Sequence, residues 1–225
     1  AASGAKVLHL RCVEYARRED VRVHVRSSFS DKPGTWVMDV SDSEEEREAS
    51  MPDMEEAIIS GVCHDRSEAK ITIAGIPDSI GRAAKIFEIV ARADINIDMI
   101  VQNASRVMNG RTDLSFTLPM TDGRRAIEAI RAAQAEIGFE QLLYDDQIGE
   151  VSIVGVGMRS HPGVTGTFFR AMASEGINLQ MISTSEIRIS IVVSADQVDD
   201  AVRAAHTAFG LDAEGEAVVY AGTGR

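Results

Sequence analysis

Two short turns carry the residue types best suited to chemistry in this sequence, and each lies just before a predicted helix. They are residues 77–81 (Pro-Asp-Ser-Ile-Gly) and residues 158–163 (Met-Arg-Ser-His-Pro-Gly). A helix N-terminus presents unpaired backbone N–H groups and the positive end of the helix dipole, which suits a carboxylate. A glycine lets a ligand approach this backbone closely, and Asp78 is placed to meet an ammonium group. The first turn therefore has the minimum equipment for binding the zwitterion of a free amino acid.

An ordinary capped helix is the competing interpretation of both turns, with Asp78 or Ser160 as the cap. Polar residues also follow the strand expected after each first helix, namely Gln102 and Asn103 in one place and residues 183–186 in the other. They are candidates for holding the side chain of a ligand, or they satisfy their own backbone. The sequence leaves both alternatives open.

Most familiar catalytic motifs are missing from the sequence. It has no glycine-rich phosphate loop ending in Gly-Lys-Ser/Thr, and Ser160 stands where residues 155–157 would need the third glycine of a dinucleotide fingerprint. The five histidines show no pair at metal-ligand spacing on a helix, and no Cys-x-x-Cys accompanies them. A Gly-x-Ser-x-Gly nucleophile elbow is also absent. We retain only His161 as a candidate ligand-binding histidine, because it lies in the second turn.

The composition indicates an acidic globular protein. The 225 residues include 23 Lys and Arg against 35 Asp and Glu, a formal net charge of −12. Such a chain is poorly suited to nucleic acid or an anionic membrane, because both attract basic surfaces. No apolar run approaches the roughly 20 residues that span a bilayer, and no signal peptide is visible. Cys12 and Cys63 form no disulfide framework or metal knuckle, so we expect a cytoplasmic location.

The order strand, helix, strand, strand, helix, strand is predicted twice after residue 56. In the first copy, strands are expected at 71–73, 95–99, 114–118 and 142–148, with helices over 83–90 and 126–137 and an Asn-Gly turn at 109–110. In the second copy, residues 151–155 repeat 71–75 and residues 177–182 repeat 95–100, while 198–209 and 217–220 supply the last helix and strand. We interpret this pattern as an internal duplication.

Two further segments precede the duplicated part. Residues 1–37 are predicted to form a short helix, a strand and a turn, which is too little to enclose a core. Residues 38–55 are rich in acidic residues and poor in apolar ones, so they are interpreted as a solvated linker or, alternatively, an acidic docking segment. The chain does not begin with Met and opens inside the predicted helix, so we expect a piece of a longer protein.

Several segments in combination closely resemble the tandem ACT domains of the aspartokinase family. They are residues 96–103 (Asn-Ile-Asp-Met-Ile-Val-Gln-Asn), 143–147 (Leu-Tyr-Asp-Asp-Gln), 160–164 (Ser-His-Pro-Gly-Val), 183–190 (Ser-Thr-Ser-Glu-Ile-Arg-Ile-Ser) and 219–225 (Val-Tyr-Ala-Gly-Thr-Gly-Arg). The resemblance covers essentially the whole chain. Residues 4–9 resemble the end of the family's kinase domain, and residues 25–35 resemble the exit from it.

The resemblance implies an α+β fold with two ferredoxin-like βαββαβ (ACT) domains on antiparallel sheets, preceded by a short remnant of the kinase domain. The expected divisions are the remnant at 1–37, the acidic linker at 38–55, ACT domain 1 at 56–149 and ACT domain 2 at 150–225. A leading strand at 56–64 is expected either to stay with ACT domain 1 or to join ACT domain 2.

The resemblance further implies a regulatory region that binds threonine and lysine for feedback inhibition. The family uses ATP to phosphorylate the side-chain carboxylate of L-aspartate, which opens the pathway to lysine, threonine and methionine. ATP and magnesium belong to the family's kinase domain, whose Lys-Phe-Gly-Gly-type motif is absent here, so we expect no cofactor and no kinase activity in this chain alone. The expected partners are a second copy, paired through the ACT domains, and a full-length α subunit, with which the family's separate β subunit pairs. Residues 54–58 resemble the internal start of that β subunit, and this chain begins upstream of it, so we expect a longer C-terminal piece than the β subunit.

Two sets of effector-binding residues carry over by position. The threonine set is Asp78, Gly81, Ala83 and Gln102, with Asn178 and Leu179 approaching from a facing copy. The lysine set is Asp98, His161, Val164, Ser185 and Glu186, in which Asp98 or Glu186 would pair with the lysine ammonium. The family often has Lys-Pro at the positions of Ser79 and Ile80, so the first turn departs from the family pattern there.

Three other functions remain as alternatives. The chain could be an amino-acid-binding ACT module of another enzyme, although the specific tail and residues 1–37 argue against it. A competent phosphotransferase would need a nucleotide site that the sequence does not show. A purely structural oligomerisation module would keep the fold without working effector sites, and a ligand-induced change in dimer mass would distinguish it.

Overall fold

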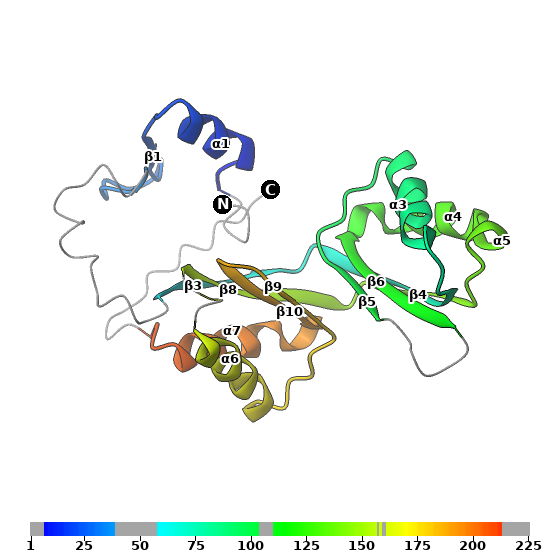
Figure 1. The fold of residues 1–225 in the computed structure, drawn as a ribbon. Coiled ribbons are helices and arrows are strands. Elements are labelled where there is room, and N and C mark those ends of the chain that lie inside the picture. The colour runs from blue at the N-terminus through cyan, green and yellow to red at the C-terminus, as the bar shows by residue number, and fades with distance from the viewer. Residues whose placement is uncertain (1–6, 39–57, 104–109, 157, 159–160, 213–225) are drawn as a thin grey trace. The chain divides into compact units, whose positions relative to one another are not determined.

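The computed structural model describes residues 7–38, 58–103, 110–156, 158 and 161–212 (Figure 1). The chain divides into two compact units, Ala1–Ile58 and Ile59–Arg225. The first unit holds helix α1 (Leu10–Arg18) and an antiparallel ribbon of β1 (Val23–Val25) and β2 (Thr35–Val37). His24 and Trp36 are register partners in this ribbon, and their rings stack at 3.9 Å. The helix, strand and turn predicted for residues 1–37 are thus observed, with one further strand.

The first half of the second unit is a four-stranded antiparallel sheet in the order β5-β6-β4-β7. Its strands are β4 (Glu68–Pro77), β5 (Ile100–Asn103), β6 (Arg111–Pro119) and β7 (Gln141–Asp145). Its helices are α3 (Arg82–Arg92), α4 (Gly123–Ala132) and α5 (Gln134–Ile137), and α4 follows the short 3-10 helix η2 (Met120–Asp122). The apolar stripe of α3 buries Ile86 and Val90 against Ile71, Ile73 and Phe116 of the sheet.

A β-bulge in β4 positions the first turn. Ile71 and Ile73 face the core in strict alternation, but the register against β6 shifts between Ile73 and Ile76, so Ile76 is buried as well. Gly75 occupies the bulge with a φ of +69°, a conformation that glycine adopts without steric cost. Its N–H donates to Asp113 Oδ1 at 2.8 Å, and Arg111 donates to its carbonyl oxygen. The bulge therefore sets where β4 ends and the turn at 77–81 begins.

The second half repeats this arrangement with one substitution of strands. Its sheet has the order β3-β8-β10-β9, formed by β3 (Ile58–Asp65), β8 (Ile148–Val156), β9 (Met181–Thr184) and β10 (Arg188–Ser194). Helices α6 (Pro162–Ser174) and α7 (Val198–Ala208) lie together on one face of it, and α7 follows the short 3-10 helix η3 (Ala195–Gln197) (Figure 1). Beside β8, β3 occupies the edge that β7 occupies beside β4 in the first half. No helix in the described residues is long and apolar enough to cross a bilayer.

The strand predicted at residues 95–99 is wrong, because the observed strand β5 begins at Ile100. Ile95 and Met99 are buried, so the alternation correctly reports which side chains face the core. The backbone meets β6 only through Thr117, which accepts from Asp98 N at 3.2 Å and donates to Met99 O at 3.0 Å. An extended segment packed on a core shows the same period of two as a strand in a ladder.

The single helix predicted over 126–137 is also wrong, because it is interrupted. Helix α4 ends at Ala132, and α5 runs only from Gln134 to Ile137. Ala133 N donates to Ile130 O, three residues back, which tightens the last turn of α4, and Gly138 at φ +79° ends α5. The final strand predicted at 217–220, residue 109 of the Asn-Gly turn and the linker at 39–55 lie outside the described residues.

The two sheets of the second unit meet around a small apolar cluster. Met99, Ile148, Met181 and Val192 are buried in it, and Val101 packs against them. Met99 and Met181 occupy equivalent positions in the two copies, so the duplication places like residues on both sides of the contact. Polar contacts flank this cluster, and they matter for the sites described next.

Candidate functional site

A small cavity of about 80 Å³ lies where the turn after β4 enters α3. It is lined by Ile76, Pro77, Asp78, Ser79, Gly81, Arg82, Ala83, Ile86, Gln102, Thr112 and Leu114. The cavity thus brings together Asp78, Gly81, Ala83 and Gln102, which come from the turn, the helix start and strand β5. Its floor is apolar, because Ile76, Ile86 and Leu114 are almost fully buried.

Helix α3 begins without a side-chain cap. Its N-cap residue is Gly81, at φ +90°, and no side chain bonds the first turn of the helix. The alternative in which Asp78 caps the helix is therefore wrong. A β-carbon at Gly81 would have no atom within 4 Å, so the space beside the helix start is open. Arg82 N donates to Ser79 O at 3.3 Å, and the next N–H groups of the first turn have no side-chain cap. The helix start consequently faces an accessible surface that suits an anion.

The charged groups around this cavity leave Asp78 available. Arg82 Nε donates to Ser79 Oγ at 3.1 Å, and its Nη1 donates to the carbonyl oxygens of Glu136 and Ile137 at 2.8 and 3.2 Å. Within the part of the chain that the structure describes, the Asp78 carboxylate has no hydrogen-bond or ion-pair partner, and it is exposed. An acid and an uncapped helix start therefore border one cavity, which is the complement of an amino-acid zwitterion.

The size of the cavity indicates the class of ligand. A volume of about 80 Å³ exceeds the ~30 Å³ share of one water molecule. It is far below the roughly 300 Å³ at which pockets for drug-sized ligands begin. A small metabolite fits this range, whereas a nucleotide does not.

Asn178 and Leu179 do not line this cavity in the single chain. They lie in the segment between α6 and β9, where Asn178 is exposed and Leu179 is half-buried. Next to the cavity, the side chain of Ile80 is fully exposed.

The structure gathers part of the lysine set around Arg188, at the start of β10. Asp98 Oδ1 lies 3.8 Å from Arg188 Nη2, and Ser185 donates to Arg188 O from its N–H at 2.7 Å and from its hydroxyl at 3.2 Å. Glu186 is exposed in the turn between β9 and β10. His161 is the N-cap residue of α6 without a side-chain cap bond, and Val164, 8% exposed, lies in the first turn of that helix.

Arg188 also faces a buried acid that sequence reasoning missed. Glu150 in β8 has a side chain only 8% exposed, and its Oε1 lies 3.7 Å from Arg188 Nη1. Ser152 Oγ donates to that carboxylate at 2.9 Å and shares a second hydrogen bond of 2.6 Å with Ser190. The sequence did contain a signal for Glu150. The two copies are offset by 80 residues, and at this offset Glu150 occupies the position that Lys70 has in the first copy.

The environment of Glu150 disfavours its charge. Burial raises the pKa of the Glu150 carboxyl above its ordinary value, and the negative charge of Asp98 raises it further. The hydrogen bonds from Ser190 and Ser152 and the charge of Arg188 oppose this shift of the pKa. Two carboxylates therefore share one arginine at the junction of the sheets.

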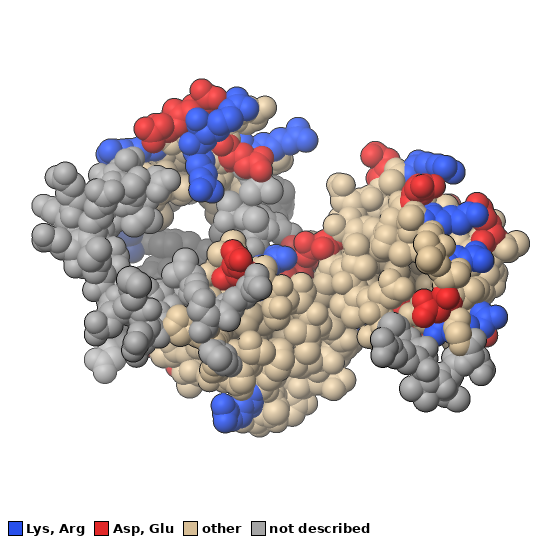
Figure 2. Space-filling model, viewed as in Figure 1, with Lys and Arg blue, Asp and Glu red and all other residues tan. Residues whose placement is uncertain are grey.

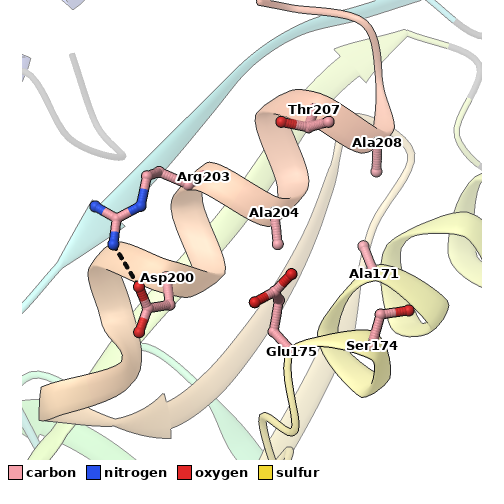
Figure 3. A pocket seen from close by; sticks show the side chains of 8 residues that line it. All are labelled: Ala171, Ser174, Glu175, Asp200, Arg203, Ala204, Thr207 and Ala208. Atoms are coloured by element: carbon pink, nitrogen blue, oxygen red, sulfur yellow. Dashed lines mark hydrogen bonds and ion pairs between the residues drawn. The ribbon is translucent and has the colours of Figure 1, made fainter.

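A second hollow, of about 370 Å³, lies between α6 and α7 (Figure 3). Small side chains line most of it, and Arg203 pairs with Asp200 at its rim. None of the residues of the two effector sets borders it. We therefore do not take this groove as the candidate site.

Charged side chains elsewhere on the second unit are mostly paired. In the view of Figure 2, they gather over α3, α4 and α5, whereas few lie over α6 and β10. On those helices Lys85 pairs with Glu136 at 2.7 Å, and Arg124 approaches Glu128 at 3.7 Å. Among the described residues, no group of three His, Cys, Asp or Glu side chains is placed to hold a metal ion. The acids at Asp78, Asp98 and Glu150 thus stand out as the ones set beside candidate ligand positions.

Comparison with known proteins places this arrangement in context. A family model described as ACT domain matches residues 71–134 and 151–209. The aspartokinase of Mycolicibacterium smegmatis is 58% identical over 227 residues, covering 100% of this chain and 52% of the relative. The chain therefore spans about half the length of the curated relatives it matches.

Two solved structures match at 42% identity with a TM-score of 0.64. One is a structure of aspartokinase alpha and beta subunits, and covers 68% of this chain and 99% of the solved chain. The other is the ligand-free regulatory subunit of aspartate kinase from Thermus thermophilus, with 67% and 98% covered. Each solved chain is thus matched almost in full by about two thirds of this chain.

Proposed function

Because this chain belongs to the ACT domain family, as the regulatory region of an aspartokinase, we propose that it binds threonine and lysine and thereby inhibits aspartate phosphorylation. Threonine is assigned to the cavity beside α3, and lysine to the residues around Asp98. The observation that carries the proposal is the cavity itself, where an unpartnered acid, an uncapped helix start and a strand amide meet.

Each group of threonine has a counterpart at the cavity. Its carboxylate accepts from the first N–H groups of α3, with Gly81 allowing close approach. Its ammonium group pairs with the Asp78 carboxylate. Its hydroxyl group hydrogen-bonds to the side-chain amide of Gln102, which can both donate and accept. The apolar floor of Ile76 and Leu114 receives the methyl group.

A second copy completes this site in our proposal. Asn178 and Leu179 of a facing copy cover the cavity and the exposed Ile80, so the homodimer forms through the ACT domains. Edge strands β5 and β9 give each sheet an open side beside these residues. The similarity to a structure of aspartokinase alpha and beta subunits supports a full-length α subunit as a further partner.

In our proposal the side-chain ammonium of lysine pairs with Asp98 or with Glu186. The remaining residues of the lysine site are Ser185 and, at the start of α6, His161 and Val164. ATP and magnesium are assigned to the part of the relatives that this chain does not span, and we propose that the chain alone needs no cofactor.

The proposed mechanism is a shift of populations between two quaternary arrangements. Effectors that bind between ACT domain 1 and ACT domain 2 across the dimer favour one arrangement by their differential affinity for it. In that arrangement the attached kinase domains are less active. An effector that bound both arrangements equally would leave the activity unchanged.

Titration calorimetry of the chain with threonine tests the proposal. We expect a saturable heat with threonine at millimolar concentration or below, and Gln102→Ala should weaken binding about tenfold, the value of one lost hydrogen bond of about 1.4 kcal/mol. Gln141→Ala is the matched control, because Gln141 is also an exposed glutamine in an edge strand of the same sheet.

The possible outcomes separate the alternatives. No heat with millimolar threonine would leave an oligomerisation module as the better description. Equal affinities of the Gln102 and Gln141 variants would remove Gln102 from the site while leaving effector binding in place.

A further inference from the structure

The two copies carry opposite charges at one pair of equivalent strand positions. Lys70 of β4 and Glu150 of β8 each precede matching strand residues at an offset of 80. Lys70 Nζ donates to Gln180 Oε1 across the junction and lies 3.6 Å from Asp145. Gln180 is itself the counterpart of Asp98, since residues 177–182 repeat 95–100. The two ends of the junction are therefore related by the duplication but differ in charge.

At the end of the junction that holds Lys70, strand β4 supplies the cation, and its partner across the junction is the neutral side-chain amide of Gln180. At the other end, the strand supplies the acid Glu150 and the partner across the junction is the acid Asp98. Their common cation, Arg188, comes from β10 instead. This second end has an excess of negative charge that the first end lacks.

The hold of Arg188 on these carboxylates is loose. Its guanidinium nitrogens lie 3.7 Å from Glu150 and 3.8 Å from Asp98, which is beyond the range of a direct hydrogen bond. The Arg188 side chain is 32% exposed, whereas that of Glu150 is 8% exposed. The acid is thus confined, while its cation has access to water and room to withdraw.

We propose that Arg188 is the resident counter-cation of the lysine site and that the side-chain ammonium of the effector replaces it between Asp98 and Glu150. This inference rests on the proposed function and deepens it. An ammonium group is compact and has three rotatable donors, so it suits a place between two carboxylates, whereas the planar guanidinium lies 3.7 and 3.8 Å from them.

The location of Arg188 agrees with this role. Both donors of Ser185, a residue of the lysine set, bond to the carbonyl oxygen of Arg188, so the backbone of the arginine is already part of the site. Displacement of the side chain alone would leave that backbone in place. Glu150 is then a specificity-determining residue. Its buried carboxylate favours a ligand with a cationic side chain, because a neutral ligand side chain cannot compensate the buried negative charge.

Competition has a measurable sign. Because lysine must displace Arg188 from the two carboxylates, the observed affinity for lysine is lower than the intrinsic affinity of the vacant site. Removing the guanidinium should therefore tighten lysine binding, whereas an arginine that held the carboxylate of the ligand, or only the fold, would weaken it when removed. Few substitutions of a site residue are expected to raise affinity, so the direction is diagnostic.

The test is calorimetry of the full chain with lysine and with norleucine, its isostere without the ammonium, at pH 8. We expect Arg188→Gln to bind lysine at least fivefold more tightly than the unaltered chain and norleucine no more tightly. Arg203→Gln makes the same change of net charge on α7, where Arg203 pairs with Asp200 and with neither Asp98 nor Glu150, and should alter lysine affinity less than twofold. Glu150→Gln should weaken lysine binding at least fivefold.

The outcomes distinguish this inference from the function on which it rests. If the unaltered chain binds threonine but not lysine, the lysine half of the proposed function fails and the inference with it. If the unaltered chain binds lysine and Arg188→Gln binds it equally or more weakly, the inference alone is overturned. Should Arg188→Gln not fold, Glu150→Gln decides, because unchanged lysine affinity in that variant also overturns it.

Discussion

Glu150 is under a clear electrostatic constraint in the described part of the chain. Its carboxylate is buried in a strand, is hydrogen-bonded by the hydroxyls of Ser152 and Ser190, and lies 3.7 Å from the Arg188 guanidinium. Removing one partner of a buried charge is expensive, because the remaining charge loses its compensation. A residue kept under these conditions influences stability in a way that depends on pH, whatever its part in ligand binding.

Glu150→Gln should change the pH dependence of stability. The folded-state pKa of Glu150 is raised above its ordinary value of 4.5, chiefly by burial, so the native chain binds more protons than the unfolded chain between these two values. The free energy of unfolding therefore falls as pH rises through that window. Glutamine cannot ionise, so the variant should gain stability relative to the unaltered chain as pH rises from about 4.5 to 8.

Urea unfolding at several pH values measures this difference. Glu175→Gln, at an exposed acid at the end of α6, serves as the control and should follow the curve of the unaltered chain. Parallel stability curves for Glu150→Gln and the unaltered chain would show that Glu150 does not titrate differently in the native state.

At this scale the sequence predicted the residues of the turn better than those of the junction. Asp78, Gly81 and Ala83 are close in the chain and follow a recognisable strand-to-helix pattern, and the cavity includes them together with Gln102. Glu150 and Arg188 are 38 positions apart in sequence, and only the pairing of β8 with β10 brings them together. No local pattern reports such a pair.

Among the elements, β4 has the most influence on the candidate site, because its bulge determines the direction of the turn that follows. Gly75 is left-handed at φ +69°, and its backbone bonds to Asp113 and Arg111 hold it there. Arg111 Nε also pairs with Glu140 at 3.2 Å, which ties the bulge to the segment before β7. The end of β4 is consequently held on both sides.

Gly75→Ala should lower the free energy of unfolding by about 1–2 kcal/mol, the cost of a left-handed conformation for a residue with a β-carbon. That β-carbon would lie 2.7 Å from Glu140 Oε2 and 2.8 Å from Glu140 Cγ, so the Glu140 side chain must move and its pairing with Arg111 weakens. Urea unfolding gives the measurement.

Gly61→Ala is the matched control for this change. Gly61 lies in β3, its φ is not in the left-handed range, and no atom lies within 4 Å of a β-carbon built there. This variant should be as stable as the unaltered chain or slightly more stable. A loss of the same size in both variants would mean that the bulge carries no special constraint.

The elements themselves were predictable where burial and hydrogen bonding coincide. The apolar stripe at Ile86 and Val90 gave α3 correctly, because a helix satisfies its backbone within itself. The alternation at Ile95, Ile97 and Met99 did not give a strand, because ladder pairing depends on a neighbour that the segment does not contain. Periodicity reports burial, and backbone pairing must be found separately.

For the whole molecule, the duplication is the most informative feature of the sequence. The resemblance of residues 96–103 and 183–190 to tandem ACT domains is confirmed by the relatives, as is the fold of two α+β halves with antiparallel sheets. The final strand predicted at 217–220 lies outside the described residues, and the leading strand expected at 56–64, for which both domains were left open, is observed as β3 beside β8 in the second sheet. A repeated sequence thus specifies two similar halves without specifying which segment completes each sheet.

Threonine should strengthen the association of two copies, because in our proposal Asn178 and Leu179 of the facing chain complete the site, so that only the dimer binds threonine tightly. A ligand that binds one state stabilises it by RT ln(1 + [L]/Kd) for each site. At a threonine concentration of about ten times Kd, each site contributes a factor of roughly 11, and two sites per dimer lower the dissociation constant of the dimer about 100-fold. Sedimentation velocity across a dilution series measures this shift.

Valine, which replaces the hydroxyl of threonine by a methyl group, is the control ligand, and it should shift the association less because it cannot bond to Gln102. The Gln102→Ala variant should respond to threonine and valine alike. If calorimetry detects threonine while the dissociation constant of the dimer stays the same, the cavity of Asp78 and Gly81 is complete within one chain, and Asn178 and Leu179 have no part in it. If threonine strengthens dimerisation of the unaltered chain but not of Gln102→Ala, then threonine binding at Gln102 of β5 and association of the two copies are thermodynamically linked.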